Sequence, residues 1–368
     1  MTDTGNCRRM FGGANTSKGF VSLFDNMINP FNSRKIIIKG GPGLGKSTFM
    51  RQIGDFMMEK GYDVEYFHCS SDPGSLDGVV IPSIKVAILD GTSPHTVDPV
   101  YPGAVDEILN FGEFWNESAL RQSREEIIKL TCETGRHFSR AYRLLKAAEE
   151  IKQDWREANI QALDVAQANK VYETIKNDIF KSSDIASAPG KQRHLFASAI
   201  TPEGFVHYLP TLVGPCSKRY VVEGGPGSGK STLVSRLAAS AVKRGIDVEI
   251  YHCSLNPDSI EHLIIPSMGV AIVTSHEPHE YMTTEDDTLV DMSQCLDETV
   301  TRRYSEIMEY DRRMMKRLLD RSVSTLRSAI VTHDALEDIY TPNIDFSGIT
   351  KLCDKTVEKI FRYAEDKM

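Results

Sequence analysis

The chain has 368 residues, 40% hydrophobic and 26% charged, so each half is long enough to bury its own core. Its formal net charge of −8 argues against non-specific binding to nucleic acid or to an anionic membrane. The seven cysteines form no disulfide pattern, and the first 20 residues contain no apolar signal segment. We therefore expect a reduced, cytoplasmic protein with no membrane span and no nucleic acid partner.

A β-branched strand predicted at 35–39 leads into a glycine-rich turn and then a helix. The pattern is G-x-x-x-x-G-K-S, which is typical of a phosphate-binding P-loop. Its glycines tolerate positive φ, so that backbone N–H groups can surround an anion. We expect Lys46 to reach the phosphates of a nucleotide and the Ser47 hydroxyl to bind Mg²⁺. The predicted nucleotide-binding residues are Gly40, Gly41, Pro42, Gly43, Leu44, Gly45, Lys46, Ser47 and Thr48.

The next elements alternate between helix and strand. Apolar residues recur every three or four positions from Phe49 to Met57, which predicts an amphipathic helix. Apolar runs at 63–67, 79–81 and 86–89 predict strands. This alternation around a P-loop predicts an α/β fold with a parallel sheet in a three-layer arrangement.

Two acids are candidates for holding Mg²⁺. Asp90 ends the apolar run 86–90, the position at which P-loop proteins carry a metal-binding acid. Asp72 follows the preceding strand and competes for the same role. In the alternative interpretation, Asp90 only caps the turn that follows it.

His68 and His95 follow predicted strands and are further catalytic candidates. Because strand ends line the ligand crevice of an open α/β sheet, these imidazoles could meet near the phosphates. Cys69 beside His68 also suits zinc, although the spacing matches no zinc module. The structural alternative is a buried thiol beside an imidazole that is hydrogen-bonded to the backbone.

Long helical segments are predicted at 117–181 and 297–366, each forming a hairpin or a small bundle. They either pack on their own core or on the other half, or act as an arm or lid that binds a protein partner. A linker rich in Ser, Ala, Pro and Gly at 182–191 divides the chain into domains 1–190 and 191–368.

The motif occurs twice, 184 positions apart, and 25 of the 56 positions from 40 to 95 are identical in 224–279. Such a long period predicts two tandem domains that form an intramolecular pseudo-dimer. In the second loop, Ser231 is the predicted metal ligand. The nucleotide-binding residues predicted there are Gly224, Gly225, Pro226, Gly227, Ser228, Gly229, Lys230, Ser231 and Thr232.

The two halves differ at the candidate acids. Asp72 corresponds to Asn256, and Asp90 corresponds to Thr274. Neither replacement supplies a charge that offsets a cation. We therefore predict a catalytic first site and a binding or regulatory second site, unless Glu261, Glu277 or Asp286 provides the missing carboxylate.

Both loops identify the chain as a member of the P-loop NTPase superfamily. It further resembles a bacterial family of tandem P-loop ATPases and ATP-binding proteins. That resemblance implies ATP and Mg²⁺ as cofactors and ATP hydrolysis as the activity. A kinase for a small molecule or nucleotide and a non-catalytic nucleotide-dependent regulator are the alternatives, whereas a GTPase is disfavoured because no Asn-Lys-x-Asp segment follows either sheet. The segments that carry the closer resemblance are Lys39 to Thr48, His68 to Pro73, Ser75 to Gly78 and Asp90 to His95.

Overall fold

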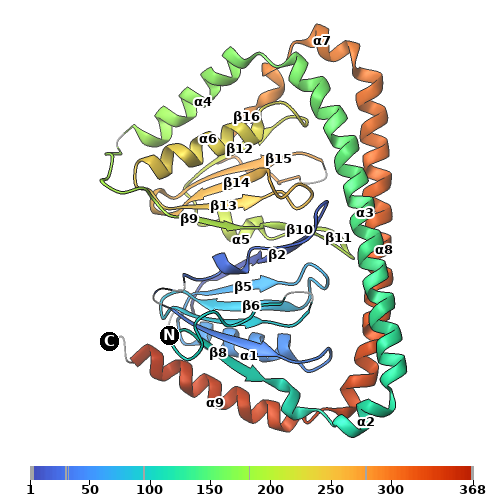
Figure 1. Ribbon diagram of the computed structural model, residues 1–368. Coiled ribbons are helices and arrows are strands. Elements are labelled where there is room, and N and C mark those ends of the chain that lie inside the picture. The colour runs from blue at the N-terminus through green and yellow to red at the C-terminus, as the bar shows by residue number, and fades with distance from the viewer. Residues whose placement is uncertain are drawn as a thin grey trace.

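The computed structural model describes residues 4–29, 31, 33–93, 96–181, 183–277 and 280–365. The protein is an α/β protein with two mixed sheets of six strands, one from each half of the chain (Figure 1). Within the described part of the chain, no helix is long and apolar enough to cross a membrane.

The first sheet has the strand order β1-β5-β6-β7-β4-β8, and β6 runs antiparallel to both of its neighbours. The other pairs are parallel, so the prediction of a parallel sheet is wrong at this strand. Only residues 82–85 connect β6 to β7, and such a short connection can join antiparallel strands but not parallel ones. The strands are β1 (Cys7–Phe11), β4 (Arg34–Lys39), β5 (Val64–His68), β6 (Leu76–Ile81), β7 (Val86–Asp90) and β8 (Asp106–Asn110).

The second sheet repeats this arrangement. Its order is β16-β12-β15-β14-β13-β9, with β14 antiparallel to its neighbours. The internal duplication therefore extends to the order and direction of the strands. The strands are β9 (Gln192–Leu195), β12 (Lys218–Glu223), β13 (Val248–His252), β14 (Ile260–Ile265), β15 (Val270–Ser275) and β16 (Asp287–Asp291).

One face of each sheet is covered by helices. Helix α1 (Lys46–Glu59) lies on the first sheet, and α6 (Lys230–Lys243) lies on the second. The apolar residues of α1 recur every three or four positions, which places Phe49, Ile53 and Met57 on the side buried against the strands.

The opposite faces of the two sheets meet in a shared core. Met10, Phe67 and Leu89 of the first half cluster there with Tyr251 and Val273 of the second. The predicted three-layer arrangement within each half is therefore wrong, because the other half takes the place of the third layer. Small elements lie between the sheets: β2 (Gly13–Thr16), β3 (Gly19–Ser22), η1 (Phe24–Asn26), β10 (Ser198–Thr201), β11 (Gly204–His207) and α5 (Leu209–Val213).

Two buried carboxylates and two partly buried arginines lie between the two halves. Arg8 forms ion pairs with Glu65, at 2.9 Å, and with Glu249. Arg193 pairs with Glu65 at 2.6 Å and with Glu249 at 3.5 Å. Each arginine therefore bridges carboxylates from both halves, and we refer to these four residues as the central ion cluster.

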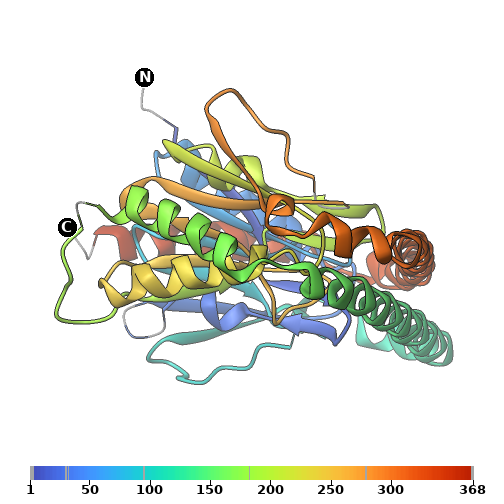
Figure 2. The ribbon, with the colours of Figure 1, turned by 90° about the horizontal axis from the view of Figure 1, so that it is seen from above.

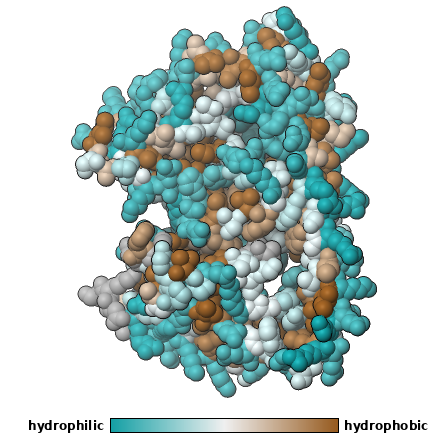
Figure 3. Space-filling model, in the orientation of Figure 1, coloured by the Kyte–Doolittle hydropathy of each residue, from teal (hydrophilic) through white to brown (hydrophobic). Residues whose placement is uncertain are grey.

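A helical arm follows each sheet. The long helices α3 and α8 lie side by side and antiparallel along the molecule (Figures 1 and 2). They bury Leu145 and Ala148 together with Met315 and Leu326. On the face seen in Figure 3, hydrophilic side chains predominate and hydrophobic ones form separate patches. The arm helices are α2 (Glu117–Gln122), α3 (Arg124–Ala162), α4 (Val165–Phe180), α7 (Glu298–Arg303), α8 (Ser305–Tyr340) and α9 (Phe346–Glu365).

The last helix of each arm packs on the other half. Helix α4 adds Tyr172 and Ile175 to the core around α6, and α9 adds Ile349 and Ile360 to the core around α1. The predicted hairpins are therefore wrong, because α3 has 39 residues and finds a partner of similar length in the 36-residue α8 rather than in α4. Short 3₁₀ turns complete the fold: η3 (Phe111–Phe114), η4 (Pro266–Met268), η5 (Met292–Cys295) and η6 (Thr341–Asn343).

Candidate functional site

Each glycine-rich loop joins the strand next to the edge of its sheet, β4 or β12, to the start of a helix. In the first loop, Gly43 and Gly45 have φ angles of 69° and 68°, a region that residues with a side chain seldom occupy. Helix α1 begins directly afterwards, at Lys46, whose Nζ donates a hydrogen bond to the Gly41 carbonyl at 2.6 Å. The loop therefore curls around a helix N-terminus, whose free N–H groups and dipole favour an anion.

Asp90 lies beside the lysine of this loop. It is the last residue of β7, and its Oδ2 is 3.6 Å from Lys46 Nζ. Its Oδ1 accepts a hydrogen bond from the Thr92 N–H at 2.9 Å. Both interpretations of Asp90 thus agree with the geometry, since one oxygen caps the turn while the other faces the lysine.

Asp77 is a second carboxylate at this place, and the sequence patterns predicted no role for it. Gly78 pairs with Leu89 in the antiparallel ladder of β6 and β7, so Asp77 and Asp90 are the next cross-strand neighbours. Asp77 is only 3% exposed. It was missed because β6 was expected to run parallel to β7. The four-residue connection between the two strands is nevertheless a sequence signal for antiparallel pairing.

The start of β6 also contacts the start of α1. The Leu76 N–H donates a hydrogen bond to the Ser47 hydroxyl at 2.9 Å. Ser47, Asp77 and Asp90 therefore bring a hydroxyl and two carboxylates to one end of the sheet, next to the loop lysine. Such hard oxygen ligands suit Mg²⁺, so the residues present fit the metal that the sequence predicts.

Asp72 does not join this group. Its Oδ1 accepts a hydrogen bond from the Gly74 N–H at 3.1 Å, and its Oδ2 accepts one from the Ser75 hydroxyl at 2.5 Å. The side chain is exposed and stabilises the turn between β5 and β6. The other candidate on a strand end, His95, lies outside the described residues.

The repeated histidines make structural contacts. His68 Nδ1 is 2.8 Å from the Pro73 carbonyl oxygen, and its ring packs 4.3 Å from that of Tyr208 in the other half. His252 repeats the contact with the Pro257 carbonyl at 2.7 Å. Burial lowers the pKa of His68 to about 4, so its ring is neutral at pH 7. These contacts match the structural interpretation of the repeated histidines.

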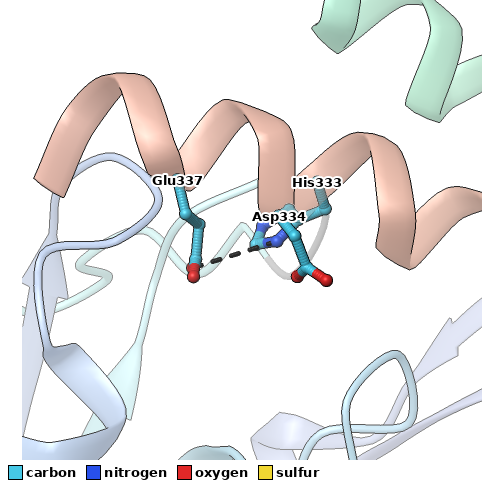
Figure 4. A group of neighbouring side chains, drawn as sticks. All are labelled: His333, Asp334 and Glu337. Atoms are coloured by element: carbon cyan, nitrogen blue, oxygen red, sulfur yellow. Dashed lines mark ion pairs between the residues drawn. The ribbon is translucent and has the colours of Figure 1, made fainter.

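The repeated cysteines are also buried. Burial raises the pKa of Cys69 well above its usual value and that of Cys253 to about 11, which keeps both thiols protonated. Among the described residues, the one group of three ligand-type side chains within 4.8 Å of one another is His333, Asp334 and Glu337 on α8 (Figure 4). An arrangement of this kind on a single, partly exposed helix face does not by itself define a metal site.

The second loop has the same shape but different neighbours. Lys230 Nζ donates a hydrogen bond to the Gly225 carbonyl at 2.9 Å. The buried Thr274 stands at the position of Asp90, and Glu261, 3% exposed, is its cross-strand neighbour. The predicted ligand Ser231 is exposed at the first turn of α6.

Of the three acids considered as substitutes in the second half, Glu261 is the one buried beside this loop. Glu277 forms an ion pair at 3.0 Å with Arg312 of α8. Asp286 lies in the chain just before the edge strand β16. The second half therefore has a single carboxylate where the first half has two.

The long helix of each arm ends on the loop of the other half. The Gly43 N–H donates a hydrogen bond to Glu337 Oε1 of α8 at 3.1 Å. At the second loop, the Asn159 amide of α3 donates to the Pro226 carbonyl at 2.6 Å. Residues from both halves of the chain therefore surround each loop.

No family model matches the chain, and no curated protein or solved structure shows significant similarity to it. The resemblance to tandem ATPases remains a prediction that rests on the motifs.

Proposed function

We propose that the protein binds ATP and Mg²⁺ at both loops and hydrolyses ATP at the first. The observation that carries this proposal is the meeting of Lys46, Ser47, Asp77 and Asp90 at one sheet edge, next to a loop with two left-handed glycines. Ligands of α/β proteins bind at the carboxyl ends of parallel strands, where this group lies. The second half has Thr274 in place of Asp90 and so lacks this carboxylate, which favours a binding or regulatory role for the second loop.

Each residue of the first site has a distinct part in this proposal. The N–H groups of the loop and of the first turn of α1 bind phosphate oxygens. When ATP binds, Lys46 gives up its hydrogen bond to the Gly41 carbonyl and donates to a phosphate oxygen. Ser47 and Asp90 would hold Mg²⁺, which neutralises charge on the terminal phosphates when it is bound. Asp77, the cross-strand neighbour of Asp90, adds a second negative charge that favours a cation at this position.

The direct test compares phosphate release from ATP and from GTP, with Mg²⁺ and with a chelator. We expect release from ATP that stops when Mg²⁺ is removed. ATP binding without release would instead favour the non-catalytic regulator, for which the missing acid in the second half is the supporting observation. An absence of ATP binding in calorimetry would overturn the proposal.

Asp77→Asn is expected to slow phosphate release by about 10- to 100-fold, as is typical when a partner of a metal ligand is changed. The side chain keeps its size but loses its charge, so ATP affinity should change little. The matched control is Asp72→Asn, which makes the same change in an exposed turn. An equal loss of turnover in both variants would contradict the role of Asp77.

A further inference from the structure

Helix α3 of the first half forms one wall of the second loop. A Cβ added to Gly227 would lie 2.3 Å from the carbonyl oxygen of Arg156, so the loop and the helix are in direct contact. Asn159, three positions further along α3, bonds to the loop carbonyl of Pro226. Any ligand held by this loop therefore lies next to the last turns of α3.

Lys152 lies on α3 one turn before Arg156, and its side chain points into this region. Its Nζ is 3.9 Å from Cys253 Sγ and 3.9 Å from Glu149 Oε2, and its side chain is 17% exposed. Burial acts against its charge, but the carboxylates of Glu149 and Glu261 contribute to raising the pKa of Lys152 above its usual value. The ammonium group is therefore charged at pH 7.

This ammonium group lies close enough to the lysine of the second loop to repel it. Burial, followed by repulsion from Lys152, lowers the pKa of Lys230 to about 8, with Glu261 acting in the opposite direction. Two neighbouring ammonium groups with limited exposure disfavour each other. A bound polyanion would remove that repulsion, since both groups could then donate charge-assisted hydrogen bonds to it.

The other arm carries different side chains at the matching positions. Two isolated bridges join the arms, one between Trp115 and Ile344 and the other between Leu163 and Leu296. The two bridges are equivalent if each residue of the first arm corresponds to the residue 181 positions later, since 296 − 115 = 181 and 344 − 163 = 181. At that offset His333 matches Lys152.

The alignment also pairs Glu337 with Arg156. At the first loop, the Glu337 carboxylate accepts a hydrogen bond from Gly43, whereas α3 brings a lysine to the second loop. The two arms therefore give the two loops different electrostatic surroundings.

We propose that Lys152, supplied by the arm of the first half, contacts the polyphosphate of a nucleotide bound in the second loop. This inference rests on ATP binding at that loop and adds that the second site is composite. When the nucleotide binds, Lys152 gives up its ion pair with Glu149 and contacts a phosphate oxygen. Lys230 likewise gives up its hydrogen bond to the Gly225 carbonyl. The arm of the first half thereby responds to occupancy of the second site.

The experiment measures ATP and ADP affinity by calorimetry in full-length protein that carries Lys46→Ala, so that the second loop provides the binding. Lys152→Ala in this background is expected to weaken ATP binding by about 10- to 100-fold. Lys152→Arg, which keeps the charge, should restore most of the affinity. The matched control is Lys146→Ala, which removes the same charge from an exposed position of α3.

Equal ATP affinities with and without Lys152 overturn the inference while leaving ATP binding intact. If the parent protein binds no ATP, the proposed function fails and this inference fails with it. Thermal unfolding shows whether each variant is folded. If Lys152→Ala does not fold, Lys152→Gln replaces it, because glutamine keeps a polar side chain without the charge.

Discussion

Replacing Lys46 with alanine is expected to lower phosphate release from ATP by about 100- to 1000-fold, the usual loss when one donor to the transition state is removed. Lys46 lies at the start of α1, 3.6 Å from Asp90, where a cation can stabilise charge that develops on a transferring phosphate. The measurement is steady-state phosphate release at saturating ATP. Calorimetry confirms that the second loop still binds ATP.

The matched control for this prediction is Lys230→Ala, which removes the corresponding lysine of the second loop. That site lacks the acid found at Asp90, so most of the turnover should remain. Equal losses in the two variants would contradict an independent first site, and would show that the two loops act as a single unit. No loss in Lys46→Ala would contradict the catalytic assignment of the first loop.

Removing Glu249 from the central ion cluster is expected to destabilise the protein by about 3–5 kcal/mol, because Glu249 is buried and its loss leaves two partly buried arginines without their full complement of carboxylates. Glu249→Ala breaks ion pairs with Arg8 and Arg193, which come from different halves. The measurement is the free energy of unfolding in urea. The control is Asp258→Ala, which breaks an ion pair with Lys18 that also joins the halves but is exposed, and it should cost about 0–1 kcal/mol.

The contribution of Glu249 should also depend on pH. Burial raises the pKa of this carboxyl, but the hydrogen bonds and charges of Arg8 and Arg193 outweigh burial and lower it overall. Its contribution to stability is therefore present above the unfolded-state pKa of about 4.3 and is lost as the pH falls through the lower folded-state value. The stability difference between the parent and Glu249→Gln should narrow in that acidic range. A constant difference from pH 7 to pH 3 would contradict this assignment.

Local patterns were enough to predict the elements around the first site. The run before Gly40 forms β4, the periodic apolar residues after Lys46 form α1, and the apolar run before Asp90 forms β7. These features depend on short-range preferences and on alternation of apolar residues, which a single sequence displays directly. The proximity of Lys46 and Asp90 followed because adjacent parallel strands end at the same edge.

The direction of a strand and the exchange of the arms do not follow from local apolar patterns. Asp77 was overlooked because an apolar run has the same composition whichever way the strand runs. The periodicity of α4 and α9 shows that each helix has an apolar side but not which core it covers. The duplication makes this ambiguity worse, because α1 and α6 present similar apolar surfaces, with Phe49 and Leu233 at equivalent positions.

The exchanged helices also have a consequence for how the chain folds during synthesis. Helix α9 follows every other element in the sequence, yet its Ile360 is fully buried beside α1 and β4 in the first half. Domains usually fold one after another as they leave the ribosome, the N-terminal one first. Here the N-terminal half must wait, with an uncovered apolar surface on α1, until α9 has been translated.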